Sequence, residues 1–472
     1  MTTAVLWFRR DLRLSDHPAL LAAATEADEV LPLFVLDDAL RGPSGAPRLA
    51  FLYRCLRELE DRTDGRLRVL TGDPEQVVPR VAREVGLPVA SSWNLGVPQN
   101  ADAAVREGIL DVVLISSDHA PYGRARDERV RAALEGTPLT TSGSPYGVTP
   151  GSLRKDDGTP YRVYTPFARA WRARGLRSPA QRPDALRWTD GGLGTDGVPA
   201  DPDLGDIVLP EAGEPAALQT FQEFRERAVA SYAEARNLPA TPGTSVMSAY
   251  LKYGCIHPRT MHAALGDTEG ERTYGGELIW RDFYADVLWH QPGSARWDLT
   301  AQLTGLEYDE GPDADAHFQA WASGRTGFPI VDAGMRQLLG EAWMHNRVRM
   351  IVGSFLTKDL HLAWQRGARH FMQHLRDGDL ASNQHGWQWI AGTGTDASPY
   401  FRVFNPVKQG KDYDADGEYV RRWVPELREL TGKAVHEPWT LPGGPPNGYP
   451  LPIVDHSAER LESLRRYEGV KQ

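Results

Sequence analysis

The first part of the chain alternates short apolar runs with amphipathic stretches. Near-continuous apolar runs occupy residues 4–8, 29–37, 67–73 and 111–118, and residues 48–63 and 74–86 between them have helical spacing. Apolar strands that alternate with helices are typical of a parallel sheet covered on both faces. The pattern therefore predicts an α/β domain with a doubly wound parallel sheet over residues 1–135. Residues 89–108 are expected to hold a strand, a loop and a short helix.

The pattern changes twice further along the chain. Residues 136–213 are rich in Gly, Pro and Asp and are predicted to be a long interdomain linker, with one helical island at residues 161–175. From residue 214 to 472, apolar positions recur with 3.6-residue spacing and no convincing strand is found. This part is predicted to be a large all-α domain, and no internal repeat is detected.

Composition limits the class of protein. A chain of 472 residues with 41% hydrophobic and 25% charged residues is expected to form two or three globular domains. No apolar run has the length of a membrane span, and Cys55 and Cys255 are the only cysteines. We therefore expect a cytoplasmic protein with no membrane association, and we expect a monomer. The net charge of −10 permits a local basic groove, because phosphate binding depends on charge distribution.

Several common catalytic motifs are absent. The turn after the first apolar run, "RRDLRLSDHPAL", lacks the glycines of a dinucleotide fingerprint and the lysine of a P-loop. Arg9, Arg10 and Arg13 in this turn could clamp an anion, although a solvated loop is the favoured interpretation. No G-x-S-x-G, H-E-x-x-H or C-x-x-C pattern occurs. The sequence therefore does not indicate a hydrolase.

Three segments of the helical part carry candidate binding residues. Thr244, Ser245 and Ser248 are placed at the start of a helix, where hydroxyls and free amides can bind phosphate or simply cap the helix. In the next segment, helical spacing puts Glu277, Trp280, Arg281 and Tyr284 on one side of a helix. Residues 343–350 add Asn346, Arg347, Arg349 and Met350. For each segment taken alone, capping, packing or a solvated basic face is the simpler interpretation.

The combination favours a site for flat heterocycles. Glu277, Trp280, Asn346, Met350 and Trp389 together suit a nucleobase-like ligand. Asp377, Asp379 and Asn383 could bind a second polar heterocycle. A site rich in indoles and poor in nucleophiles indicates that a bound cofactor performs the chemistry.

The motifs "WFRRDLRLSDHPAL", "TGFPIVDAGMRQL", "WMHNRVRM" and "DGDLASNQHGWQWIAGTGTDASPYFRVFNP" resemble the DNA photolyase and cryptochrome family over nearly the whole chain. The resemblance implies an α/β antenna domain followed by a helical domain that holds FAD. It points most closely to class I cyclobutane pyrimidine dimer photolyases. Such enzymes flip the dimer out of damaged DNA and split it with an electron from excited reduced flavin.

The resemblance also assigns roles to individual residues. It implies that Glu277 hydrogen-bonds the dimer and that Asn383 faces the reactive nitrogen of the flavin. It implies that Trp387 and Trp364 belong to a chain of tryptophans that photoreduces the flavin. The implied FAD contacts are Tyr232, Thr244, Ser245, Val246, Met247, Ser248, Arg281, Arg349, Asp377, Gly378, Asp379 and Asn383, with Arg349 paired to Asp377. The implied dimer and DNA contacts are Glu277, Trp280, Asn346, Met350 and Trp389, and Arg347, Arg402 and Lys408 are predicted to contact phosphates.

The chain departs from the family pattern at two places. The third tryptophan of the electron chain has no obvious counterpart, and Tyr308 or Trp297 could serve instead. In the first domain, Tyr122 and Gly123 stand where folate-binding relatives carry Asn and Glu. A deazaflavin or a second flavin is therefore expected before methenyltetrahydrofolate, and the absence of any antenna chromophore stays open.

Two other readings compete with repair. A cryptochrome-type blue-light sensor would bind FAD without repairing DNA, but sensors of the plant type tend to carry Asp where this chain has Asn383. Photolyases for (6-4) lesions carry histidines around residues 346–350, and only His345 is present. Glu277, Trp280 and Met350 together favour a dimer pocket. Helix packing alone would not explain why Trp387 and Trp389 lie among polar residues.

Overall fold

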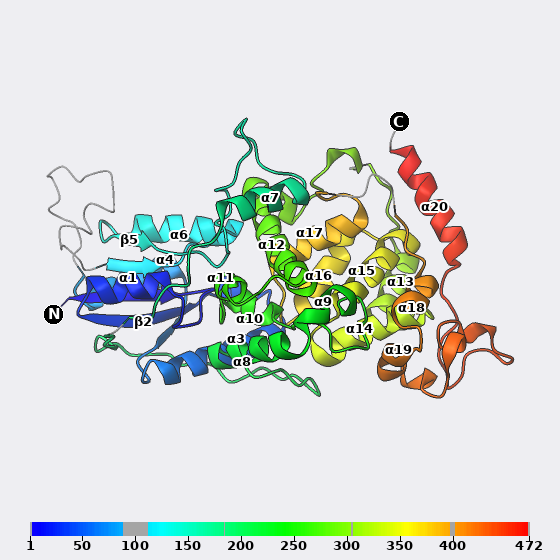
Figure 1. Cartoon of the computed structure of the whole chain (residues 1–472), viewed down its shortest axis with the longest axis horizontal. Helices are drawn as coiled ribbons and strands as arrows, with labels where there is room; N and C mark the ends of the chain where they lie inside the picture. Colours follow the sequence, from blue (N-terminus) through cyan, green and yellow to red (C-terminus); the bar gives the residue numbers. More distant parts are fainter. Residues whose placement is uncertain (1, 88–111, 184, 304, 397–401, 471–472) are drawn as a thin grey trace.

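The computed structural model describes residues 2–87, 112–183, 185–303, 305–396 and 402–470. The chain forms a sheet-containing part and a helical part that lie side by side along the long axis of the molecule (Figure 1). The segment 89–108, for which a strand and a short helix were predicted, lies outside the described residues.

A five-stranded parallel sheet forms the N-terminal part. Its strands are β1 (Thr3–Phe8), β2 (Glu29–Leu36), β3 (Arg68–Thr71), β4 (Val112–Ile115) and β5 (Leu139–Thr141), in the order β3-β2-β1-β4-β5. The predicted doubly wound sheet is confirmed. Strand β5 was not foreseen, because it has three residues and one apolar side chain, and it lies in the segment predicted as linker.

Helices cover both faces of the sheet because successive strand residues point to opposite sides. Leu6 and Phe8 of β1 belong to one apolar core and Val5 and Trp7 to another, and all four are buried. The helices of this part are α1 (Pro18–Glu26), α2 (Asp38–Arg41), α3 (Ala46–Arg62), α4 (Pro74–Glu84) and α6 (Pro121–Ala133). Continuous apolar strands are therefore buried on both faces, as the sequence pattern indicated.

The linker packs on both parts of the molecule. Trp188 forms a parallel bridge with Val30, which adds a fragment of linker backbone beside β2. The helical island is α7 (Tyr164–Arg174), which packs on the helical part. The limits 1–135, 136–213 and 214–472 remain predictions.

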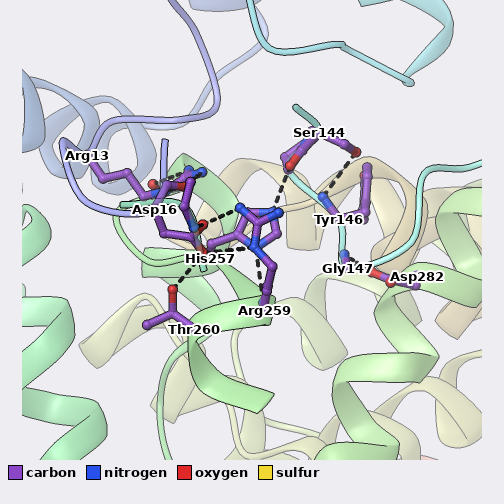
Figure 2. A network of polar contacts seen from close by, with 12 residues as sticks. Arg13, Asp16, Ser144, Tyr146, Gly147, His257, Arg259, Thr260 and Asp282 are labelled. Atoms are coloured by element: carbon purple, nitrogen blue, oxygen red, sulfur yellow. Dashed lines mark hydrogen bonds and ion pairs between the residues drawn. The ribbon is translucent and has the colours of Figure 1, made fainter. Parts of the chain in front are cut away.

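Asp16 is the centre of a polar network that joins the two parts (Figure 2). Its carboxylate accepts hydrogen bonds from Thr260 Oγ1 at 2.8 Å and from the backbone of Ala180 at 2.7 Å, and it pairs with Arg259. Beside it, His257 Nε2 bonds the carbonyl of Ser144 at 2.8 Å. Segments from the sheet, the linker and the helical part therefore meet at one buried carboxylate.

The regular elements of the C-terminal part are all helices among its described residues, as predicted. Its α-helices are α8 (Glu214–Arg227), α9 (Tyr232–Ala235), α10 (Ser248–Tyr253), α11 (Pro258–Ala263), α12 (Glu269–His290), α13 (Pro312–Ala322), α14 (Pro329–Glu341), α15 (Asn346–Ser354), α16 (Trp364–His374), α17 (Leu380–Ala391), α18 (Pro406–Tyr413), α19 (Glu418–Trp423) and α20 (His456–Gly469). Single turns of 3₁₀-helix lie at Val229–Ser231, Pro292–Ala295, Ala301–Leu303, Pro425–Leu427, Gly432–Val435 and Pro438–Thr440, and a π-helical turn at Phe355–Asp359. None of the described helices combines the length and apolar character that a membrane span requires.

Helix α12 is the main wall of the helical part. It has 22 residues and begins with a capping box, in which Thr268 and Glu271 bond each other's backbone amides. Asp282 on this helix accepts hydrogen bonds from the backbone of Val148 at 2.8 Å and from Trp171 Nε1 at 2.8 Å. The linker and α7 are therefore attached along one side of α12, and α17 packs along it as well.

Candidate functional site

A cavity of about 520 Å³ lies among α9, α10, α12, α15 and α17 in the helical part. Its size is that of a typical cofactor or ligand site. Nineteen of the residues that the sequence singled out line it: Tyr232, Thr244, Ser245, Val246, Met247, Ser248, Glu277, Trp280, Arg281, Tyr284, Asn346, Arg349, Met350, Asp377, Gly378, Asp379, Asn383, Trp387 and Trp389. Segments from Tyr232 to Trp389 thus converge on one space.

One wall is a loop of hydroxyl-bearing residues before α10. The sequence placed Thr244 and Ser245 at the start of a helix, but α10 begins only at Ser248 and Met247 occupies the cap position. Val246 adopts a left-handed φ of 52°, which turns the loop ahead of the helix. Tyr274 Oη donates to Ser245 Oγ at 2.9 Å. The loop therefore presents hydroxyls to the cavity by its own turn, not by capping α10.

The face of α12 toward the cavity carries Glu277, Trp280, Arg281 and Tyr284, as the spacing predicted. Glu277 Oε1 forms an ion pair with Arg236 Nη1 at 2.8 Å. Burial raises the pKa of Glu277, and Arg236 opposes this rise without cancelling it. The pKa of Glu277 is therefore higher than that of an exposed glutamate. Arg281 donates to the carbonyl oxygens of Pro145 and Leu251 at 2.8 and 3.1 Å, so backbone contacts hold it in the wall.

Trp280 is supported from behind by the linker helix. Its indole stacks on the ring of Tyr164 with 3.7 Å between ring centroids and an interplanar angle of 4°. Tyr164 Oη donates to the carbonyl of Gly276 at 2.8 Å, which ties the tyrosine to α12. One face of Trp280 is therefore covered by protein, and only the other can stack on a ligand.

Asp377 pairs with Arg349, as predicted, with 2.9 Å between Asp377 Oδ2 and Arg349 Nη2. The other oxygen, Oδ1, is buried and has no hydrogen-bond partner among the described residues. Gly378 follows, and a Cβ at this position would lie 2.6 Å from Arg48 Nη1. A buried acceptor without a partner in a cavity wall indicates a place for a ligand donor.

Asp379 connects the cavity to the sheet. Its Oδ2 lies 2.6 Å from Arg10 Nη2, and its Oδ1 caps α17 through the amide of Ser382 at 3.1 Å. Burial by itself would raise the pKa of Asp379, but Arg10, Lys252 and Arg281 hold it well below its usual range. The carboxylate is therefore ionised.

The turn after β1 is not the solvated loop that the sequence favoured. Arg9 and Arg13 are buried: Arg9 pairs with Asp127 at 2.9 Å, and Arg13 donates to the carbonyl of Gly254 at 3.1 Å. Arg9, Arg10 and Arg13 therefore all contact carboxylates or carbonyl oxygens of the protein itself. The reason is that the turn is enclosed between the sheet and the helical part, which neither periodicity nor composition indicates.

Helix α17 presents two indoles in different environments. Trp387 is buried, and its ring lies so close to Gly367 of α16 that a Cβ there would be 2.2 Å from Trp387 Cη2. Trp389 lines the cavity and is only partly buried. Asn383 Nδ2 donates to the carbonyl of Ala368 at 3.1 Å, which fixes its orientation toward α16.

Four predicted site residues lie outside the cavity lining. Trp364 is fully buried on α16 and donates from Nε1 to Asp298 Oδ1 at 2.7 Å. Arg347 donates to Asn237 Oδ1 at 2.7 Å. Lys408 pairs with Asp412 at 2.8 Å on the surface, and Arg402 is exposed. Arg347 and Lys408 therefore bind other residues of the protein, and Arg402 lies outside the cavity lining.

The two candidates for the end of the electron chain differ in environment. Tyr308 has a buried hydroxyl without a hydrogen-bond partner among the described residues, and burial together with nearby Asp298 raises its pKa. Trp297 is 71% exposed and precedes Asp298 in the chain. Asp298 therefore links Trp364 to the neighbourhood of both candidates.

The sequence missed several cavity residues. Arg236, Lys252, Tyr274 and Trp343 line the cavity but were not singled out. Lys252 follows Ser248 by four positions, so helical spacing could have indicated it. The same kind of spacing could have indicated Arg236, which follows Tyr232 by four positions, and Tyr274, which precedes Glu277 by three positions on α12. No cluster of metal-ligating side chains occurs among the residues that the structure describes.

Family models match both parts of the chain. A model described as DNA photolyase matches residues 4–90 and 97–184, and one described as FAD binding domain of DNA photolyase matches residues 274–469. A deoxyribodipyrimidine photo-lyase from Streptomyces griseus is 40% identical over 483 residues, which cover 100% of both chains.

Solved structures resemble the whole chain. A class III photolyase from Agrobacterium tumefaciens has a TM-score of 0.87 and 34% identity, covering 100% of this chain and 98% of that one. A cryptochrome from Synechocystis has a TM-score of 0.85 and 26% identity, covering 98% and 99%. A Sulfolobus tokodaii photolyase with two FAD molecules has a TM-score of 0.83 and 27% identity, covering 99% and 100%.

Proposed function

This chain belongs to the DNA photolyase family, and on that basis we propose that it repairs cyclobutane pyrimidine dimers in DNA by a light-driven electron transfer. The observation that carries the proposal is the cavity itself. It joins a wall suited to FAD to a surface formed by Glu277, Trp280, Met350 and Trp389.

The cavity residues fit FAD. The hydroxyls of the loop 244–248 suit its phosphates and ribityl chain, and the unpartnered Oδ1 of Asp377 suits a ring or amine donor. Asp379 and Asn383 line the same space, and Arg349 neutralises Asp377. When bound and reduced, FAD supplies the electron that splits the dimer after it absorbs light. The protein binds and orients the cofactor and excludes water from it.

Glu277 is proposed to donate a hydrogen bond to a carbonyl of the dimer. Burial already raises its pKa, and Arg236 is its one charged partner among the described residues. A DNA phosphate at the cavity mouth would attract Arg236, and Glu277 would then be still easier to protonate. A protonated carboxyl stabilises negative charge that develops on the dimer.

Trp280 and Trp389 are proposed to hold the flipped-out bases. Since Tyr164 covers one face of Trp280, the dimer would stack on the other. Replacing Tyr164 with leucine should weaken binding of dimer-containing DNA about two- to thirteenfold, from the loss of a stacked pair worth about 0.5–1.5 kcal/mol. Tyr164→Phe keeps the stack and is the control. Equal affinities of the two variants would show that Tyr164 does not orient Trp280.

The proposal also includes a path of aromatic residues that supplies electrons to the flavin and an antenna chromophore that collects light. Trp387 packs on Gly367, which lies three residues from Trp364 on α16, so a path from Trp387 to Trp364 and on to Tyr308 or Trp297 is consistent with the packing. At the antenna positions, a Cβ on Gly123 would lie 2.1 Å from the Asp118 carboxylate. This crowding supports a deazaflavin or a second flavin over methenyltetrahydrofolate.

The class of photolyase is part of the proposal as well. The motifs favoured class I, whereas one of the similar structures is described as class III. Phosphate contacts by Arg347, Arg402 and Lys408, a monomeric state and a cytoplasmic location remain predictions. The alternative function is a cryptochrome-type sensor, because a cryptochrome is among the similar structures.

One experiment separates repair from sensing. Flavin-loaded, chemically reduced protein is illuminated with blue light in the presence of a thymine-dimer oligonucleotide, and restored thymines are counted. We expect light-dependent repair, and Glu277→Ala should slow repair more than it weakens DNA binding. Glu418→Ala, which makes the same change at an exposed glutamate of α19, is the matched control. FAD binding without any light-dependent repair would favour the sensor.

A further inference from the structure

Lys252 is a half-buried lysine of the cavity wall. It lies on α10 and lines the cavity, and no hydrogen bond or ion pair joins its amino group to any described residue. A lysine that is partly removed from water usually has a paired charge, because an isolated ammonium is costly to desolvate. The cavity wall therefore carries an amino group that no described residue of the protein pairs.

The charges around Lys252 come from four other segments. Arg10 follows β1, Arg48 lies on α3, Asp118 follows β4 and Asp379 caps α17. Both carboxylates are already paired, Asp379 with Arg10 at 2.6 Å and Asp118 with Arg126 at 3.2 Å. Arg48 donates to the carbonyl of Met372 at 2.6 Å.

These surroundings disfavour the ammonium form. Burial and the charge of Arg10 lower the pKa of Lys252 to about 7, although Asp379 acts in the opposite direction. Near neutral pH the amino group is therefore about half protonated. An anion that entered the cavity would stabilise the ammonium and raise its pKa.

We propose that Lys252 is the cationic contact for an anionic group of FAD, and that FAD binding is coupled to the uptake of one proton by Lys252. The inference rests on the FAD site described above. In this step one proton moves from solvent to Lys252 Nζ, and no bond of the cofactor changes.

Two anionic groups of FAD share this chemistry. One is the pyrophosphate, which Ser248 favours, because Ser248 and Lys252 are four residues apart and lie on the same face of α10. The other is the isoalloxazine ring after reduction. The experiment below distinguishes them.

The test is calorimetric titration of flavin-free protein with oxidised FAD at pH 6 and pH 8. Each titration is repeated in two buffers with different ionisation enthalpies, so that the number of protons taken up is measured directly. From a pKa of about 7, the wild type should take up about 0.9 proton at pH 8 and about 0.1 at pH 6. FAD affinity should fall as the pH rises above 7.

Two variants check the assignment. Lys252→Met cannot take up the proton, and its FAD affinity should not change between pH 6 and pH 8. Lys252→Arg is always charged, so it should also take up no proton but should bind FAD more tightly than Lys252→Met at both pH values. Because the wild-type measurement stands by itself, a poorly folded variant does not leave the question open.

Riboflavin and reduction identify the anion. If the pyrophosphate is the contact, riboflavin will bind without proton uptake. If the reduced ring is the contact, oxidised FAD will bind without uptake, and the pH dependence of the flavin midpoint potential will differ between wild type and Lys252→Met. Identical proton uptake by wild type and Lys252→Met in both redox states would overturn the inference. A failure of the wild type to bind FAD would instead refute the proposed function.

Discussion

Replacement of Arg349 by methionine tests the buried ion pair of the cavity wall. Arg349 Nη2 lies 2.9 Å from Asp377 Oδ2, and the two side chains are 26% and 1% exposed. Arg349 Nε also donates to the carbonyl of Met344 at 2.8 Å. Methionine matches much of the aliphatic stem but removes both contacts, so Asp377 would remain as a buried carboxylate without its counterion.

The structure sets the expected magnitude. Removing one partner of a buried pair typically costs about 3–5 kcal/mol, most of it from the charge left behind. Arg48 and Arg376 also act on Asp377 electrostatically, so we expect the lower end, about 3 kcal/mol. The double variant Arg349→Met, Asp377→Asn should recover part of this loss, because the stranded charge is gone.

The assay is urea unfolding of the flavin-free protein, with the free energy of unfolding taken from linear extrapolation. Lys408→Met is the matched control, since it removes an ion pair of similar length, 2.8 Å to Asp412, from the surface. An exposed pair of this kind contributes less than about 0.5 kcal/mol. If Arg349→Met destabilised the protein no more than Lys408→Met, the reasoning from burial would be refuted.

Two further predictions concern stability. Gly367→Ala should destabilise the protein by about 1–3 kcal/mol relative to Gly386→Ala. Both substitutions gain the same helix propensity, but only the alanine at position 367 would meet the Trp387 ring. Equal unfolding midpoints of the two variants would contradict this prediction. The free energy of unfolding should also fall as the pH drops from 6.5 to 4. Burial lowers the pKa of five histidines to about 4, whereas the same histidines in the unfolded chain take up protons near pH 6.5. Each histidine can therefore lower the free energy of unfolding by up to about 1.4 kcal/mol per pH unit. These histidines are His119, His262, His345, His370 and His385. Asp282 and Asp286, whose pKa burial raises to about 6, act oppositely. Other buried carboxyls whose pKa burial raises, such as Asp332 and Asp359, act in the same direction as these two, so the fall should be shallower than the histidines alone would give. A flat profile from unfolding at several pH values would show that the histidines do not dominate.

The sequence determined the division into an α/β part and a helical part. Hydrophobic periodicity is a local property, so continuous apolar strands and 3.6-residue spacing can be read without knowing the contacts. Strand β5 escaped because three residues carry too little pattern. The composition of the cavity was also predictable, since Glu277, Trp280 and Asp377 lie in distinctive motifs, and the pairing of Arg349 with Asp377 followed from the resemblance.

Only the tertiary structure decided which charges and rings meet. Arg10 reaches Asp379 across 369 positions of the chain, and Tyr164 of the linker covers one face of Trp280. Neither contact leaves a signal in the local sequence, because it depends on how distant elements pack. The state of Lys252 is the clearest case. Its pKa depends on burial and on four charges from other segments, so the same residue in an exposed helix would be an ordinary lysine.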